Sequence, residues 1–277
     1  MAKPSGKSKA RYLFRAVFLP DPDRDDFIGP DRYGKGFGYT HAIHKTKWEY
    51  SPFCIPNEFV AARIGQFLGL PIPPFGISTD DSGNEFFTSL DFDFEQHEGK
   101  RIQLPGIVPD VCWKALPQLA TGVTLFDILI ANSDRHEKNL VADNVTKPSR
   151  LIVFDHDQAL LGGGNPQLRG VQRLKKLSNS LGITAGKISG GVPHCLVSHI
   201  DTAEHFEHWV NRIGAIPNWV FPEVCAEARK YGLSKAESTE LNRFLVTRRN
   251  VFQALLDVHR ASFPAIKEWT DSGLKLT

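Results

Sequence analysis

The chain has 277 residues, of which 41% are hydrophobic and 23% are charged, as is typical of a folded globular protein. Its 33 basic and 31 acidic residues leave a formal net charge of +2, which gives no strong nucleic-acid signal. No apolar run approaches the roughly 18 residues of a membrane span, and the four cysteines form no CxxC pair. We therefore expect a cytoplasmic protein with reduced thiols, built as one large domain or as two lobes that share a cleft.

The N-terminal part begins with a basic tail over residues 1–11, most simply a solubilising segment. Residues 12–18 (YLFRAVF) are predicted to form a strand. The stretch 20–38 is rich in Asp and Gly, which favours turns over regular structure. Residues 39–45 (YTHAIHK) mix aromatic, β-branched and polar side chains, so a second strand is predicted to end near residue 45.

One helix and two further strands complete this part. Residues 56–70 have apolar side chains at helical spacing, with Asn57 as a candidate N-cap and prolines after the end. Short strands are predicted over 75–78 and 85–90, because the sequence TDDSGN between them is a strong turn signal. The first ninety residues thus predict several strands around one helix.

The rest of the chain is predicted to be mainly helical. Residues 110–133 are largely apolar and predict one buried helix, and three more helical patterns follow over 203–213, 218–231 and 234–262. The change in character near residues 90–95 predicts an N-lobe over 1–92 and a helical C-lobe over 93–277.

Histidines and cysteines outside the central motif are expected to be structural. His205 and His208 have helical spacing but no third ligand at a recognisable distance, so a solvated surface is favoured over a metal site. The same interpretation is given to His194 and His199. The cysteines are expected to be small buried side chains.

The central stretch 130–160, IANSDRHEKNLVADNVTKPSRLIVFDHDQAL, contains a pattern that stability alone does not require. Asp134 and Asn139 lie on one short loop, and Asp155 follows the apolar run LIVF, where a buried strand would end. Mg²⁺ prefers such carboxylate and amide oxygens, and phosphoryl transfer needs charge neutralisation and positioning. Each residue alone would be an ordinary turn residue, but the three in order predict a nucleotide and metal site. The two elements are expected to form a hairpin with its turn at residues 144–149.

These motifs resemble the HipA-like kinases. DRHEKN has the Asp-to-Asn spacing of the protein-kinase catalytic loop, in the DRHxxN form also seen in phosphatidylinositol 3/4-kinases. LIVFDHD resembles the strand and metal-binding Asp that follow, and CIPNEFVAARIGQFLGLPIPP resembles the glutamate-containing element upstream. The resemblance covers most of residues 39–160. It implies an α+β, bilobal protein-kinase-like fold with ATP between the lobes.

The resemblance also implies roles for the residues of the central stretch. Asp134 would orient or deprotonate the acceptor hydroxyl, and Asn139 and Asp155 would hold Mg²⁺ against the ATP phosphates. His136 is a second candidate for catalysis, as in the lipid kinases. DHD stands where protein kinases have DFG, and Asp157 is either a second metal ligand or a turn residue.

Further roles are implied in the N-terminal part. Lys45 would neutralise the ATP phosphates, although Lys47 would point to the same face if the strand continued. Glu58 would pair with Lys45, or would only complement the helix dipole. Ser89 and Leu90 would belong to the hinge that receives adenine. The GKGFG run at residues 34–38 comes shortly before Lys45 in the sequence, and this separation is short for a kinase glycine loop.

The implied activity is an ATP- and Mg²⁺-dependent kinase, with a protein serine or threonine hydroxyl as acceptor and toxin-like or autophosphorylating behaviour. An antitoxin or regulatory partner is part of what the family suggests. A lipid or small-molecule kinase is the alternative, supported by the basic run LRGVQRLKK at residues 168–176. A pseudokinase would lack a residue type among Lys45, Asp134, Asn139 and Asp155, and all four are present.

Overall fold

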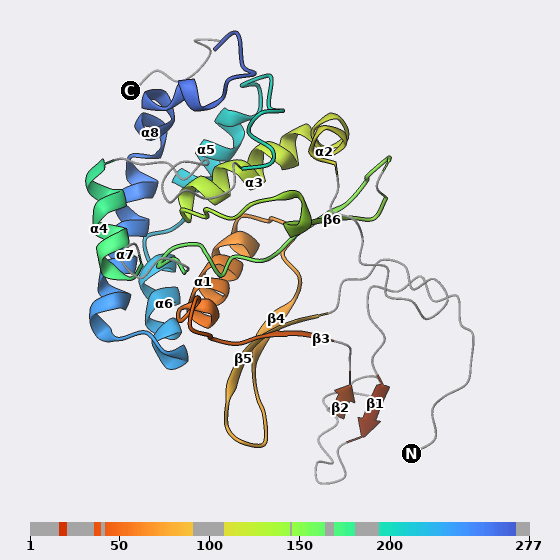
Figure 1. Ribbon diagram of the computed structural model, residues 1–277, viewed down its shortest axis with the longest axis vertical. Helices are drawn as coiled ribbons and strands as arrows, with labels where there is room; N and C mark the ends of the chain where they lie inside the picture. The colour runs from red at the N-terminus through yellow and green to blue at the C-terminus, as the bar shows by residue number, and fades with distance from the viewer. Residues whose placement is uncertain are drawn as a thin grey trace, which may run out of the picture.

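Figure 1 presents the computed structural model, which describes residues 17–20, 36–39, 42–90, 108–144, 146–163, 169–180 and 194–269. A small strand-containing N-terminal region precedes a larger helical part, which confirms the predicted α+β architecture. The basic tail 1–11 lies outside the described residues. The division into lobes at residue 92 stays a prediction, since residues 91–107 also lie outside them. Among the described helices, none combines the length and apolar character needed to cross a membrane.

A three-stranded antiparallel sheet forms the centre of the N-terminal region. Its strand order is β3 (Ala42–Lys45), β5 (Glu85–Leu90) and β4 (Phe75–Thr79), so both predicted strands over 75–90 are confirmed. The turn between β4 and β5 is organised by Asp80, whose Oδ1 accepts the N–H groups of Ser82 and Asn84. This turn fixes the register of β4 against β5, and on the other side of β5 Lys45 of β3 pairs with Phe87.

A separate two-stranded ladder joins β1 (Val17–Pro20) to β2 (Gly36–Tyr39). The predicted strand 12–18 overlaps β1 only at its end, and residues 12–16 lie outside the described residues. The predicted strand 39–45 is recovered as the last residue of β2 and all of β3. Residues 36–38 of the GKGFG run belong to β2, while its first two residues lie outside the description.

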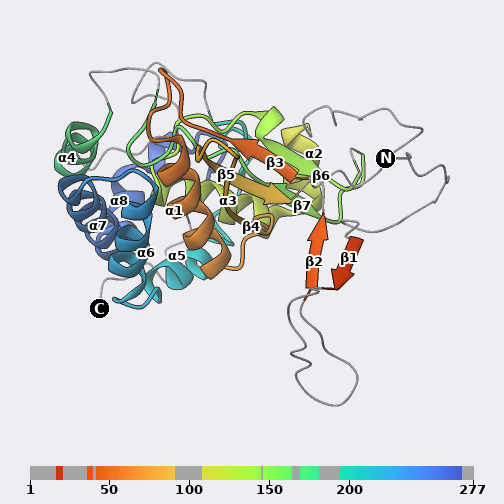
Figure 2. The same cartoon turned by 90° about the horizontal axis from the view of Figure 1, so that it is seen from below.

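Helix α1 (Cys54–Phe67) lies between the β3–β5–β4 sheet and the C-terminal helices (Figure 2). Eleven of its fourteen residues are buried, as expected for a helix that is covered on nearly all sides. The prediction of Asn57 as its N-cap is wrong, because the helix begins three residues earlier. Asn57 instead donates its amide to the carbonyl of Asp157 at 2.7 Å and accepts the N–H of Leu161. The helix is thereby hydrogen-bonded to the segment that follows Asp155.

The single helix predicted over 110–133 is observed as two helices, α2 (Pro109–Ala115) and α3 (Pro117–Leu129). The break falls at Leu116, whose φ of −135° and ψ of 53° are not helical. Pro117 causes it, because proline lacks an N–H group and disfavours the helical conformation of the preceding residue. The prediction therefore erred at a signal that the sequence contains.

Helix α3 packs against α5 (Phe206–Gly214) at Gly122. A Cβ at Gly122 would lie 2.2 Å from the ring of Trp209, whose Nε1 donates to the carbonyl of Gln118 at 2.7 Å. We expect Gly122→Ala to lower the free energy of unfolding by about 1–3 kcal/mol through overpacking. Gly214→Ala is the matched control, since its Cβ would meet nothing within 4 Å. Urea denaturation of both variants checks this, and equal stability of the two would contradict the packing.

The C-terminal helices differ from the predicted pattern in two ways. Helix α4 (Val171–Ser180) was not predicted, and the helix predicted over 234–262 is divided into α7 (Lys235–Asn250) and α8 (Phe252–Val258). Val251, with φ of −104° and ψ of 11°, turns the chain between them. The turn lets both helices bury apolar side chains in one core. The predicted helix 218–231 is confirmed as α6 (Val220–Ala228) and a short 3-10 turn.

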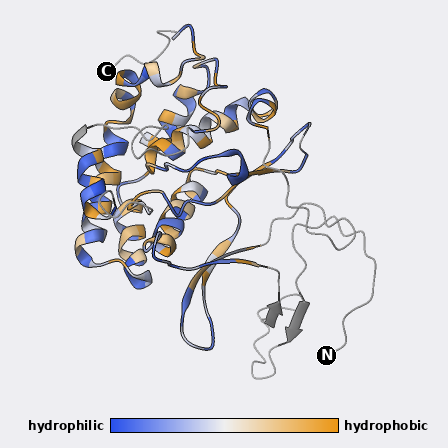
Figure 3. Cartoon of the chain, viewed as in Figure 1, coloured by the Kyte–Doolittle hydropathy of each residue, from blue (hydrophilic) through white to orange (hydrophobic). Residues whose placement is uncertain are grey.

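One apolar core extends through both regions. It includes residues of α1, β5 and α3 as well as residues of α5 to α8. Helices α1 and α3 carry long apolar stretches at its centre (Figure 3). Because the sheet and the helical part share this core, residues far apart in sequence are held rigidly beside each other.

Candidate functional site

The motif residues lie at one end of a short hairpin. Strands β6 (Leu140–Ala142) and β7 (Leu151–Val153) are antiparallel, with Leu140 opposite Val153, which confirms the predicted hairpin. Asn139 stands directly before β6, in the 3-10 turn η1 (Glu137–Asn139), and Asp155 follows β7 by two residues. The antiparallel register therefore brings these two side chains to the same end of the hairpin.

The loop before the hairpin holds Asp134 through backbone hydrogen bonds. The N–H of Asp134 donates to Oδ1 of Asn132 at 3.1 Å, and its carbonyl accepts Nδ2 of Asn139 at 2.9 Å. Burial raises the pKa of the half-buried Asp134 carboxyl, and the negative charge of Asp155 raises it further. The Asp134 carboxyl is therefore close enough to Asp155 for the charge of Asp155 to affect its pKa.

Lys45 connects the sheet to this hairpin. Its Nζ lies 2.5 Å from Oε1 of Glu58 on α1 and 2.5 Å from Oδ1 of Asp155. Burial alone would lower the pKa of Lys45, but these two carboxylates outweigh it and raise the pKa above its ordinary value. Lys47 lies beyond the end of β3 and is exposed. The geometry therefore favours Lys45 over Lys47.

Glu58 is buried, so its ionised form depends on its partners. Burial alone would raise its pKa, but the charge of Lys45 and the contact with His156 lower it from 4.5 to about 2. A lowered pKa means that this carboxylate stabilises the fold above its unfolded-state pKa and loses that contribution as the pH falls.

We therefore expect the stability gap between the wild type and Glu58→Gln to be constant above about pH 4.5 and to narrow toward about pH 2. Urea denaturation of both proteins across this range measures the gap. A gap that stays constant down to the lower pH would contradict the ion pairing of Glu58.

A cavity opens beside these charges. Apart from Lys45, Glu58 and Asp155, its lining is mainly apolar: Ile43, Ala62, Ile72, Pro73, Phe87, Ser89, Val153, Phe154 and His156. The predicted hinge residue Ser89 belongs to this lining. Leu90 does not, and its N–H donates to the carbonyl of Pro74 at 2.9 Å. An apolar cleft with a few charges at one end suits a flat ring system that carries phosphates.

His156 was not recognised from the sequence. It occupies the second position of DHD, is almost completely buried, and packs edge-on against Phe126 of α3. Its Nδ1 lies 3.4 Å from Oε2 of Glu58. Only the tertiary structure brings the two residues together, so no local pattern could have identified the contact.

His136 and Asp157 lie at the edges of the site. Nδ1 of His136 accepts the N–H of Lys138 at 3.2 Å and so caps the 3-10 turn η1. Burial and the charge of Asp155 raise the pKa of the Asp157 carboxyl, which accepts Nε2 of Gln158 at 3.1 Å. Neither residue is paired with Lys45, whereas Asp155 is.

A buried ionic network lies beneath the loop. Arg135 donates Nε to Asp127 at 2.7 Å, and its Nη1 donates to the carbonyls of Asn139 and Phe154 at 2.7 Å each. Nε2 of His194 lies 3.1 Å from Asp127, so the prediction that His194 is solvated is wrong. Arg135 thereby hydrogen-bonds both the segment that carries Asn139 and the segment that carries Asp155. The acid within the apolar run TLFDILI was a usable signal, since a buried carboxylate requires a charged partner.

Helix α4 also braces the site. Arg173 is buried and donates to the carbonyls of Ala131 at 2.6 Å and Gln158 at 3.0 Å, which flank the two motif segments. Burial lowers the pKa of Arg173 to about 10. One of the four basic residues of the run 168–176 therefore points inward and is not available to an anionic headgroup.

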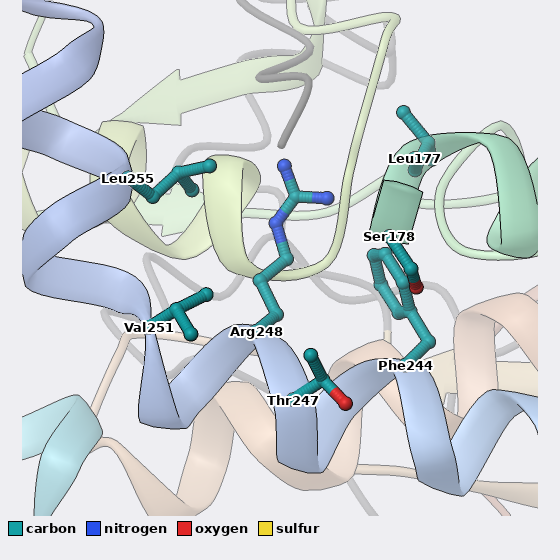
Figure 4. A pocket seen from close by; sticks show the side chains of 7 residues that line it. All are labelled: Leu177, Ser178, Phe244, Thr247, Arg248, Val251 and Leu255. Atoms are coloured by element: carbon teal, nitrogen blue, oxygen red, sulfur yellow. The ribbon is translucent and has the colours of Figure 1, made fainter. Parts of the chain in front are cut away.

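A second, narrow pocket lies between α4 and helices α7 and α8 (Figure 4). Arg248 of α7 reaches into it beside Leu177 and Ser178 of α4. Burial, together with the positive charge of Arg173, lowers the pKa of Arg248 to about 9. None of the residues predicted for the nucleotide site lines this cavity.

Backbone strain is concentrated around the motif. Among the described residues, positive φ outside glycine occurs at Ala131 (52°), Asp155 (64°) and Leu160 (49°). Such conformations cost on the order of 1 kcal/mol or more each and persist where the surroundings impose them. The N–H of Leu160 donates to the carbonyl of Ile130 at 2.8 Å, which ties the two strained turns together. Strain of this kind is typical of a functional site.

No family model and no curated protein sequence matches the chain. Among solved structures, it is similar to the Helicobacter pylori proinflammatory kinase CtkA, with 15% identity, a TM-score of 0.51, and coverage of 90% of this chain and 96% of that one. It is also similar to HipA in the Shewanella oneidensis MR-1 complex of HipA, HipB and operator DNA. There the identity is 13%, the TM-score is 0.41, and the coverage is 91% and 67%. The likeness to CtkA confirms the kinase-like fold, and with it the predicted resemblance at the level of the fold.

Proposed function

We propose that this chain is an ATP- and Mg²⁺-dependent phosphotransferase. The observation that carries the proposal is the position of Lys45, which is paired at once with Glu58 and Asp155 at the charged end of the apolar cavity. In ATP-dependent kinases, a lysine is held by a carboxylate from a helix and lies near the carboxylate that binds the metal. The kinase-like fold supports the same conclusion.

The cavity supplies the groups that binding of ATP requires. Ile43, Ile72 and Phe87 line the part that would receive adenine, with Ser89 as the neighbouring polar side chain. Lys45 would turn from Asp155 toward the α- and β-phosphates, and Glu58 would keep its ammonium group in place. We assign no contact to Leu90, because its N–H is already bonded to the carbonyl of Pro74.

Asn139 and Asp155 fit a magnesium site. Asn139 uses its Nδ2 to donate to the carbonyl of Asp134, an orientation that leaves its Oδ1 to serve as an acceptor. Asp155 is partly exposed beside the cavity, so its carboxylate is accessible to a hard cation. A bound Mg²⁺ would neutralise charge on the phosphates. In this arrangement Asp155 would bind the metal instead of Lys45, and Asn139 would contribute a neutral oxygen ligand.

Asp134 is the proposed base for the acceptor hydroxyl. Its raised pKa makes the carboxylate a better proton acceptor, and its backbone is fixed by Asn132 and Asn139. We propose a serine or threonine hydroxyl of a protein as the acceptor, on the basis of the sequence resemblance. The inward orientation of Arg173 weakens the lipid alternative. His136 stays a secondary candidate at the rim of the loop.

An antitoxin or other regulatory protein partner and a cytoplasmic location are also proposals that rest on the sequence alone. An inactive binding module is the competing interpretation. It predicts nucleotide binding without transfer of the γ-phosphate, so the same experiment separates the two.

The test is incubation of the purified protein with γ-labelled ATP, with Mg²⁺ or with EDTA, followed by mass spectrometry. We expect label on the wild type only when Mg²⁺ is present. Lys45→Ala should lose at least about tenfold of the labelling rate, whereas the matched control Lys47→Ala should keep it. Absence of both labelling and Mg²⁺-dependent ATP binding would overturn the proposal.

A further inference from the structure

The side chain of His156 lies at the junction of three parts of the molecule. It follows Asp155 in the chain, its ring packs edge-on against Phe126 of α3, and its Nδ1 lies 3.4 Å from Oε2 of Glu58 on α1. Both His156 and Glu58 are almost completely buried. The contact therefore takes place away from water, where a hydrogen bond to a carboxylate is strong and its loss is costly.

The two oxygens of Glu58 have different partners. Oε1 accepts from Lys45, which is shared with Asp155, while Oε2 faces His156. When Lys45 turns toward phosphates, its contact with Glu58 must be kept without the help of Asp155. A buried carboxylate that rotates away from its remaining partners loses most of its stabilisation. A donor on the Oε2 side opposes that rotation.

We propose that His156 is a positioning residue, which holds Glu58 in the rotamer that presents Lys45 to the nucleotide. The inference rests on the proposed function, in which the nucleotide is ATP. It gives the residue that follows Asp155, the proposed metal ligand, a role as a polar contact to Glu58. His156 acts only through Glu58 and touches neither phosphate nor metal.

The test is a double-mutant cycle between His156 and Glu58, read in two ways. His156→Leu removes the donor and keeps a branched side chain of similar size, while His156→Asn places an amide N–H near the position of Nδ1. Each is combined with Glu58→Gln. Urea denaturation without nucleotide reports the contact itself, and binding of fluorescent ATP with Mg²⁺ reports its consequence. His208→Leu, at an exposed position on α5, controls for the loss of a histidine elsewhere.

We expect His156→Leu to weaken ATP binding roughly tenfold and His156→Asn to stay within about threefold of the wild type. In the Glu58→Gln background, His156→Leu should cause almost no further loss of binding or of stability. This dependence on Glu58 is a result that a purely space-filling histidine would not produce.

Two results would overturn the inference. One is equal ATP binding by His156→Leu and the wild type. The other is an equal loss with Leu and Asn that persists in the Glu58→Gln background, which would mean that packing against Phe126 is the whole role. If the wild type binds no ATP, the proposed function fails, and the denaturation cycle still decides whether His156 and Glu58 are coupled.

Discussion

Asp134→Asn is expected to lower the rate of phosphoryl transfer roughly a hundredfold to ten-thousandfold, the range that a positioned general base contributes. The amide keeps the size of the carboxyl and cannot accept the hydroxyl proton. The backbone groups of Asp134 that bond Asn132 and Asn139 are unaffected by the change. Binding of ATP should therefore stay within about twofold of the wild type, because the proposed ATP contacts lie on other residues.

Single-turnover transfer from γ-labelled ATP, alongside equilibrium nucleotide binding, measures the two effects separately. Asp81→Asn is the matched control, since Asp81 is exposed in the turn between β4 and β5. Transfer by Asp134→Asn at the wild-type rate would remove the assigned role, and His136→Gln would then be the next variant. A parallel loss of binding and transfer would instead assign Asp134 to the nucleotide or its metal.

Asp127→Asn is expected to lower the free energy of unfolding by about 3–5 kcal/mol, which is the usual loss when one partner of a buried ion pair is removed. The carboxylate of Asp127 accepts Arg135 Nε at 2.7 Å, Arg135 Nη2 at 3.1 Å and Asn132 Nδ2 at 2.9 Å, and it also contacts His194. The substitution leaves the guanidinium of Arg135 buried without a countercharge. Because Arg135 also holds the carbonyls of Asn139 and Phe154, the loop that carries Asp134 should loosen with it.

Urea denaturation, with hydrogen exchange at the loop amides, checks both parts of this prediction. Asp110→Asn is the control, because its pair with Lys114 on α2 is exposed and should contribute no more than about 1 kcal/mol. A loss for Asp127→Asn as small as that of the control would contradict the network. Joint replacement of Asp127 by Leu and Arg135 by Met should recover part of the stability, since no buried charge is then left unpaired.

Much of the secondary structure was predictable because its causes are local. The alternation and turn chemistry around Asp80 specify β4 and β5, and the apolar spacing of 56–70 specifies most of α1. The break before Pro117 was also local and should have been predicted. The turn at Val251 and the burial of α4 are different, since they depend on how the helices divide one core.

The sequence by itself predicted which chemical groups the candidate site contains. Asp134, Asn139 and Asp155 follow one another at a recognisable spacing, and the hairpin that aligns the last two is a local structure. Lys45 was favoured as the phosphate-binding lysine, with Lys47 left open as the alternative. Such predictions are possible because short-range geometry depends on neighbours in the chain.

Only the tertiary structure decided which of these groups meet and what holds them. Lys45, Glu58 and Asp155 come from a sheet, a helix and a hairpin, and they converge because those elements share one core. The contact of His156 with Glu58 and the pairing of Arg135 with Asp127 have the same origin. Burial gives these contacts their strength, because a charge removed from water must be matched by a partner, and burial is a property of the packed chain rather than of any segment.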